Sequence, residues 1–107
     1  MVLLFLLTAC NLDQISVRWT VDATTWLAPT VTVDYTVWND GAYDLTGVNL
    51  EIGISTTLGD VISDWTPDFS LNKGETKTGT FFLNTGVETP TGAATILGVR
   101  MDNPKDS

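Results

Sequence analysis

Histidine is absent from this chain, cysteine occurs once, and only five residues are basic. Without histidine the chain lacks the commonest general base, the commonest zinc ligand and the usual switch near neutral pH. A single cysteine excludes an internal disulfide and a thiolate metal cluster. No serine has a histidine to activate it, and nothing singles out a catalytic pair among the acidic residues. We therefore expect no enzymatic activity, no metal ion and no cofactor.

The shortage of basic residues also limits the possible partners. Thirteen acidic residues, spread from Asp13 to Asp106, give a formal net charge of −8. An acidic surface repels phosphate backbones, so we expect no nucleic-acid binding, and it offers no basic patch for anionic lipid headgroups. Several acids fall in predicted turns, but no EF-hand spacing occurs and turn acids are usually solvated. The simplest role of this charge is solubility.

Long hydrophobic runs are missing as well, and the longest stands at the amino terminus. Residues Val2 to Leu7 are continuously apolar, and small residues Thr8 and Ala9 precede Cys10. As a helix, this segment would span about 14 Å, which is too short for the roughly 30 Å of bilayer hydrocarbon. The pattern is instead typical of a signal-peptide core followed by its processing point.

The four residues Leu7-Thr8-Ala9-Cys10 resemble the bacterial lipobox, in which an aliphatic residue and two small residues precede an invariant cysteine. The resemblance implies lipid attachment to the sulfur of Cys10, including a palmitate-type acyl chain, and cleavage before it. Two or three acyl chains hold a soluble domain at a membrane, whereas one holds it only marginally. We therefore expect an extracytoplasmic lipoprotein of the bacterial cell envelope, either periplasmic or on the cell surface.

This interpretation divides the chain into four parts. We expect a lipoprotein signal segment at 1–9, a short tether at 10–14, one folded domain at 15–101 and a frayed tail at 102–107. No Lys or Arg precedes the apolar run, so we expect the signal segment to be truncated at its start. The alternative is that residues 1–10 form a first strand with a buried free cysteine, which is common in protein cores.

Alternation of apolar and polar residues dominates the remainder, and no segment shows sustained helical spacing. Hydrophobic residues make up 43% of the chain, enough for one packed core. Turn residues such as Asn39-Asp40-Gly41 separate the alternating runs. Strands are predicted at residues 15–22, 30–38, 48–54, 61–65, 76–83 and 94–101. Six or seven short strands of this kind predict an all-β fold, an antiparallel β-sandwich.

The alternation also predicts which side chains face the core. Val33, Tyr35 and Val37 share one strand face, and Leu50 and Ile52 share another, so we expect these five to be buried together. Further predicted sets are Val17, Trp19 and Val21 opposite Arg18, Thr20 and Asp22; Phe81 and Leu83 opposite Phe82; and Leu97, Val99 and Met101 opposite Ile96 and Arg100.

A second resemblance comes from three consecutive segments. One strand ends in Val37-Trp38-Asn39-Asp40-Gly41, the next carries Val48-x-Leu50-x-Ile52, and Leu71-x-x-Gly74-Glu75 follows. This order is similar to the bacterial cell-adhesion-related immunoglobulin-like domains and also fits plant-stress-type immunoglobulin-like domains, over about residues 15–101. The resemblance implies an immunoglobulin-like sandwich that serves as a spacer, an adhesion module or a ligand-binding module, and fold alone does not choose among these.

Four tryptophans in so short a chain suggest a binding surface. Trp26, Trp38 and Trp65 fall in or near predicted loops and strand ends, and exposed indoles are common in interfaces. The alternative is that Trp19 lies in the core and the others cap the two ends of the sandwich. We expect a tethered structural or protein-interaction module. The rivals are a carbohydrate-binding module on envelope polysaccharide, which needs two coplanar exposed tryptophans, and a small enzyme, which needs a pocket of converging acids.

Overall fold

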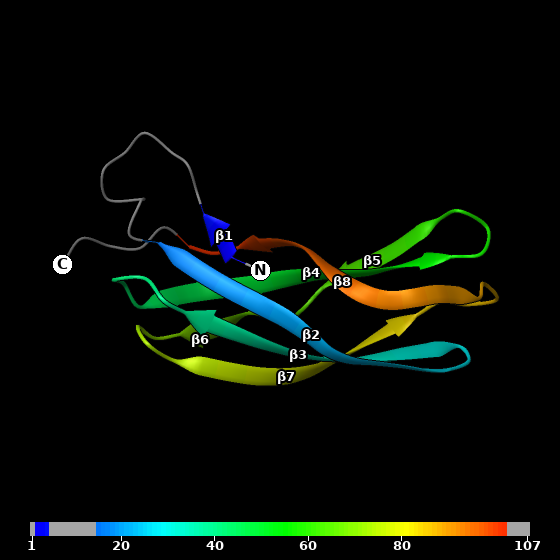
Figure 1. Ribbon diagram of the computed structural model, residues 1–107, viewed down its shortest axis with the longest axis horizontal. Helices are drawn as coiled ribbons and strands as arrows, with labels where there is room; N and C mark the ends of the chain where they lie inside the picture. The colour runs from blue at the N-terminus through cyan, green and yellow to red at the C-terminus, as the bar shows by residue number, and fades with distance from the viewer. Residues whose placement is uncertain (1, 5–14, 103–107) are drawn as a thin grey trace.

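The computed structural model describes residues 2–4 and 15–102, which form two antiparallel sheets packed face to face (Figure 1). The first sheet has the strand order β1 (Val2–Leu4), β2 (Ser16–Leu27), β3 (Thr30–Asn39) and β7 (Thr76–Asn84). In the second, β4 (Leu45–Thr56) pairs with β5 (Val61–Trp65), β6 (Phe69–Leu71) and β8 (Pro90–Arg100). Every described element is a strand, so the prediction of an all-β antiparallel sandwich is confirmed.

The amino-terminal segment is described only at β1, whose backbone pairs with the start of β2. Leu3 lies opposite Val17 in this short antiparallel pair. Cys10 and the rest of the predicted lipobox lie outside the described residues. Within the described part, no helix is long and apolar enough to cross a membrane.

The core lies between the two sheets and contains most of the side chains that alternation predicts. Val33, Tyr35, Val37, Leu50 and Ile52 are all buried in one cluster, as expected. Burial of such aliphatic and aromatic surface is the main stabilising contribution to a domain of this size. The other members of the cluster are Val17, Trp19, Val31, Leu45, Val48, Ile54, Leu71, Leu83, Ala94 and Ile96.

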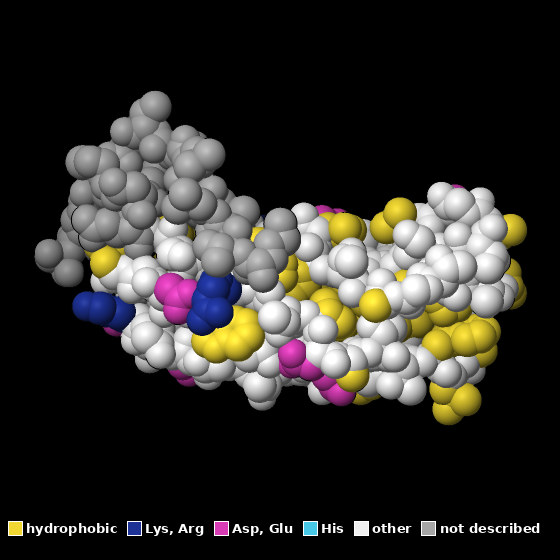
Figure 2. Space-filling view, viewed as in Figure 1, with side chains coloured by type: hydrophobic (Ala, Val, Ile, Leu, Met, Phe, Trp, Pro, Cys, Tyr) yellow, Lys and Arg dark blue, Asp and Glu magenta, His cyan; other side chains and the backbone are white. Residues whose placement is uncertain are grey.

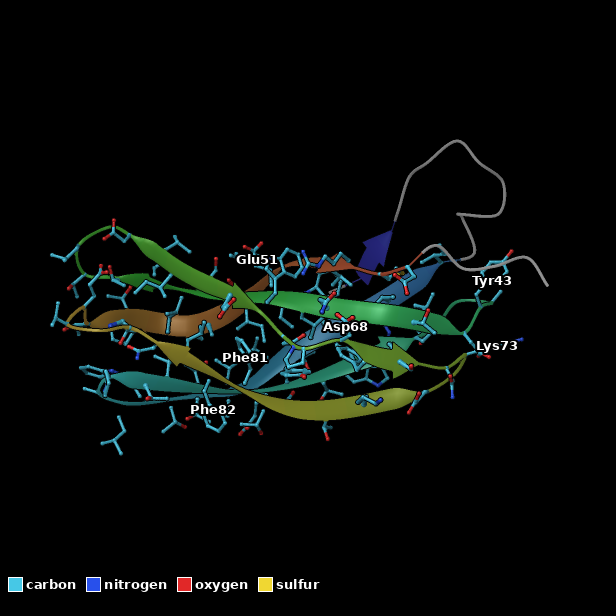
Figure 3. All side chains as sticks on the ribbon, turned by 180° about the vertical axis from the view of Figure 1, so that it is seen from behind. Tyr43, Glu51, Asp68, Lys73, Phe81 and Phe82 are labelled. Carbon is cyan, nitrogen blue, oxygen red and sulfur yellow. The ribbon has the colours of Figure 1, made fainter. Side chains whose placement is uncertain are left out.

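Strand β7 shows the predicted separation of its two faces. Leu83 is buried, and Phe81 packs against the core as a partly buried side chain. Phe82 is 63% exposed, and Figure 3 shows it directed away from the sandwich while Phe81 points between the sheets. The alternation in this strand therefore gives the correct faces, because β7 pairs with β3 without a register shift.

A glycine in β7 makes room for the tyrosine of β3. Tyr35 lies opposite Gly79, and a Cβ atom on Gly79 would be only 2.3 Å from the Tyr35 Oη. No side chain fits so close to another atom, so glycine is required here by the approach of the ring. Burial raises the pKa of the Tyr35 hydroxyl above its ordinary value of 10.0.

Strand β2 is longer than predicted, and the segment 22–29 expected as a loop is mostly strand. The register shifts between Val21 and Ala23, so Asp22 is an extra residue at a β-bulge, and pairing then continues to Leu27. A bulge of this kind breaks the period of two while preserving the ladder. The sequence prediction ended the strand at Asp22 because the alternation stops there. After the bulge, Trp26 pairs with Val31 on the inner face.

Strand β8 shifts register twice against β4, and the shift at Leu97 overturns one predicted face. Ile52 pairs with Ile96, and the neighbouring Glu51 pairs with Gly98, so Leu97 is an extra residue. Ile96 is consequently buried at 9% exposure, whereas Leu97 is 50% exposed. The prediction that put Leu97 inside and Ile96 outside is therefore wrong, because strict alternation does not hold across a bulge.

Candidate functional site

Three chain reversals meet at one end of the sandwich, and each carries an exposed aliphatic side chain (Figure 1). We call them the three hairpins, although β7 and β8 belong to different sheets. Leu27 is the last residue of β2, Leu58 lies between β4 and β5, and Val87 lies between β7 and β8. Their side chains are 82%, 72% and 101% exposed, respectively. We call this region the apolar end, defined by Leu27, Leu58 and Val87 together with the side chains behind them.

A second layer of exposed apolar side chains lies just behind the three tips. Trp26 and Val61 stand within two residues of a turn, Phe82 pairs with Thr32 two positions inward from the start of β3, and the three side chains are 45%, 58% and 63% exposed, respectively. Of the seven large hydrophobic side chains exposed within residues 15–102, six therefore belong to the apolar end, and only Leu97 lies elsewhere. Figure 2 shows hydrophobic side chains gathered at this end of the visible face. Such a concentration of exposed apolar side chains makes this end a candidate interaction surface.

Backbone hydrogen bonds close the three turns and join them to one another. Gly59 and Gly86 adopt positive φ angles of 87° and 60°, which allow the tight reversals beside Leu58 and Val87. The Thr85 amide donates to the Pro29 carbonyl at 2.8 Å, and the Thr57 amide donates to the Thr89 carbonyl at 2.9 Å. These contacts link each hairpin to its neighbour, so the tips form one preorganised surface.

Charge is distributed unevenly between the two ends of the sandwich. The segments 19–72 and 78–99, which contain all three hairpins, have no Lys or Arg. The described cations, Arg18, Lys73, Lys77 and Arg100, lie toward the opposite end, where the chain enters β2 and leaves β8. We call this the entry end; Figure 3 shows Lys73 there beside Tyr43. The apolar end instead carries Asp60 and Glu88.

The three tryptophans predicted as a binding surface lie on three different surfaces. Trp38 is on the outer face of the first sheet, where the Arg18 guanidinium lies 4.6 Å from its ring centroid. Trp65 is on the outer face of the second sheet, with the Arg100 guanidinium 4.1 Å from its ring centroid. Trp26 belongs to the apolar end. The structure thus brings none of the three indoles together.

An open hollow on the outer face of the first sheet contains two carboxylates. Its lining includes Asp22, Asp34 and Thr80. Asp22 accepts hydrogen bonds from the Thr36 hydroxyl at 2.5 Å and the Thr20 hydroxyl at 2.8 Å, and Asp34 accepts one from Thr80. The bonds from Thr36 and Thr20 lower the pKa of Asp22 below 3.8. Both carboxylates therefore accept hydrogen bonds from threonine hydroxyls of the same sheet.

Sequence reasoning missed the tip residues because each stands alone in its turn. Leu58 and Val87 lie next to glycines among polar residues, and such turns normally carry polar side chains. An isolated aliphatic residue at a predicted turn was the available signal.

In the part of the chain that the structure describes, no group of three or more His, Cys, Asp or Glu residues could hold a metal ion. Comparison with known proteins finds no matching family model, curated protein or solved structure.

Proposed function

We propose that this protein is a non-catalytic, immunoglobulin-like interaction or structural module, tethered through a lipid on Cys10 to the extracytoplasmic side of a bacterial membrane. The observation that carries the proposal is the opposition of the two ends. Cleavage before Cys10 would remove β1, so the mature chain would enter the sandwich at Ser16, at the entry end, while the exposed aliphatic tips lie at the other end. A tether at the entry end leaves the apolar end free to meet a partner.

The hydrogen bonding of the acidic side chains supports a structural rather than a catalytic domain. Glu51 accepts from the Ser63 hydroxyl, Asp68 accepts from the Asn49 amide, and Glu88 accepts from the Thr56 hydroxyl. Other carboxylates accept hydrogen bonds from turn amides; these are Asp44, Asp64 and Glu75. Groups committed to turns and strand contacts hold the local backbone and are not positioned around a common reacting atom.

The positions of the tryptophans do not favour the rival proposal of a carbohydrate-binding module. A sugar platform needs exposed coplanar rings. Trp38 and Trp65 are on opposite outer faces, and each has an arginine over its ring. The protein-interaction module therefore remains the better supported proposal.

The tether is tested by expressing the chain with its native start in a bacterium. Wild-type protein should incorporate labelled palmitate and partition into the detergent phase, because the acyl chains dominate its solubility. Cys10→Ser should lose both properties, while Ala9→Gly, which keeps a small residue before the cysteine, should retain them. Wild-type protein that stays fully soluble, unlabelled and still carries residues 1–9 would contradict the lipoprotein assignment.

A further inference from the structure

We propose that the apolar end is a membrane-binding site that inserts its three tips into the surface of an uncharged or zwitterionic lipid bilayer. The tips are Leu27, Leu58 and Val87, and Trp26 lies directly behind them. This site is separate from Cys10 and does not depend on acylation. It goes beyond the proposed tether, because it gives the domain a second membrane contact at the opposite end of the sandwich.

The shape of the apolar end fits a deformable lipid surface. Its aliphatic side chains stand on three separate hairpin turns and project outward, with the largest exposures of any hydrophobic residues described. Protruding side chains can enter a fluid bilayer without a matching cavity, whereas a protein partner would need three correctly spaced pockets.

The backbone of the turns is suited to leaving water. The Gly59 amide donates to the Thr56 carbonyl at 3.0 Å, and the Glu88 amide donates to the Thr85 carbonyl at 3.1 Å. Unpaired backbone groups are strongly disfavoured in lipid, and internal hydrogen bonds remove part of that barrier. The turns can therefore move their apolar tips into the interface while these amides keep their partners.

The order of side chains along the apolar end matches the order of environments in a bilayer surface. Aliphatic Leu27, Leu58 and Val87 are outermost, and aromatic Trp26 and Phe82 follow one or two residues behind. Aliphatic side chains favour the acyl region, while tryptophan concentrates at the membrane–water interface, where its ring is buried and its N–H stays hydrated. This layering is expected of a loop that inserts to shallow depth.

Charge selects the kind of lipid. The three hairpins have no Lys or Arg, and Asp60 and Glu88 lie beside the tips. An anionic leaflet attracts basic residues and repels carboxylates over about one Debye length. Insertion should therefore be driven by apolar contact, favour phosphatidylcholine, and weaken when phosphatidylglycerol is added.

The test uses the full chain carrying Cys10→Ser, which cannot be acylated, in flotation with phosphatidylcholine vesicles. Gln replaces Leu27, Leu58 or Val87 singly, and each change should lower the partition coefficient about tenfold through lost apolar burial. Leu97→Gln is the matched control, since Leu97 is exposed away from the apolar end; it should bind like the parent. Equal binding by parent and tip variants would place the contact elsewhere, for instance in residues 1–9, and overturn the proposal.

A second measurement locates the contact. Lipids brominated on the acyl chain should quench the fluorescence of the parent, and Trp26→Phe should remove most of this quenching. Absence of vesicle binding, or binding only when phosphatidylglycerol is present, would overturn the proposal. Tip-dependent dimerisation without vesicle binding, seen by analytical ultracentrifugation, would also overturn it in favour of a second copy as the occupant. Because Cys10→Ser cannot be acylated, failure of vesicle binding would contradict only the membrane-binding site, and failure of palmitate incorporation would contradict only the lipid tether.

Discussion

The entry end and the apolar end of this sandwich are built in different ways. At the entry end, the buried Asn39 side chain donates to the Tyr43 and Leu71 carbonyls at 2.7 and 2.9 Å. The turns there are also held by side chains, as when Asp44 accepts from the Lys73 amide. At the apolar end, backbone hydrogen bonds and the buried Thr56 and Thr85 hydroxyls hold the turns, while the side chain of Leu58 stays exposed.

This difference implies that residues of the entry end stabilise the fold, whereas the exposed tips of the apolar end are available for binding. A buried polar side chain that satisfies several backbone groups cannot be removed without leaving those groups unpaired. An exposed aliphatic side chain at a turn contributes little to the fold, because its removal creates no cavity. The entry end is therefore expected to be intolerant of substitution, while the apolar end can keep its fold when its tips are altered.

The largest expected contrast comes from the same substitution at the two ends. Leu71 is 0% exposed and Leu58 is 72% exposed. Leu71→Ala should lower the free energy of unfolding by about 2–5 kcal/mol, through lost burial and a residual cavity. Leu58→Ala should change it by less than about 0.5 kcal/mol. Urea denaturation followed by tryptophan fluorescence measures both, and similar losses would show that the apolar end also carries the fold.

A somewhat smaller contrast compares two asparagines with the same local turn. Asn39 accepts from the Gly41 amide at 2.9 Å and Asn84 accepts from the Gly86 amide at 2.8 Å. Asn39→Ala should cost about 2–4 kcal/mol, because two carbonyls lose their donor in a buried site. Asn84→Ala should cost about 0.5–1 kcal/mol, the net value of one exposed bond. Comparable losses in thermal or urea unfolding would contradict the special role of Asn39.

The smallest expected effect concerns the bulge in β2, which lies between the two ends. Asp22 has a lowered pKa because Thr36 and Thr20 donate to its carboxylate, so ionisation stabilises the folded state. Wild type should have a larger free energy of unfolding than Asp22→Asn above pH 3.8, the ordinary pKa of the group. This difference should disappear as the pH falls through the lower pKa of Asp22 in the folded state. Urea midpoints across acidic pH measure it. The same difference should shrink in a Thr36→Val background, and a difference that persists at the lowest pH would refute this origin.

Strands without bulges were accessible to sequence reasoning, and strands with bulges were not. In β3 and β7 the period of two is unbroken, so the buried positions of Val33 and Leu83 follow from alternation. In β2 and β8 one extra residue changes which side faces inward, at Asp22 and at Leu97. A bulge is defined by two residues of one strand lying opposite one residue of its partner, and that register is not visible within either strand alone.

The amino-acid sequence by itself determined the all-β class, the main core residues and the lack of cations in the three hairpins, because periodicity and composition are local properties. Only the tertiary structure decided that Leu27, Leu58 and Val87 stand together at one end. These residues are about thirty positions apart in the chain. Their proximity results from the packing of the two sheets: β3 returns beside β2, β5 returns beside β4, and β8 crosses from the end of β7 to pair with β4.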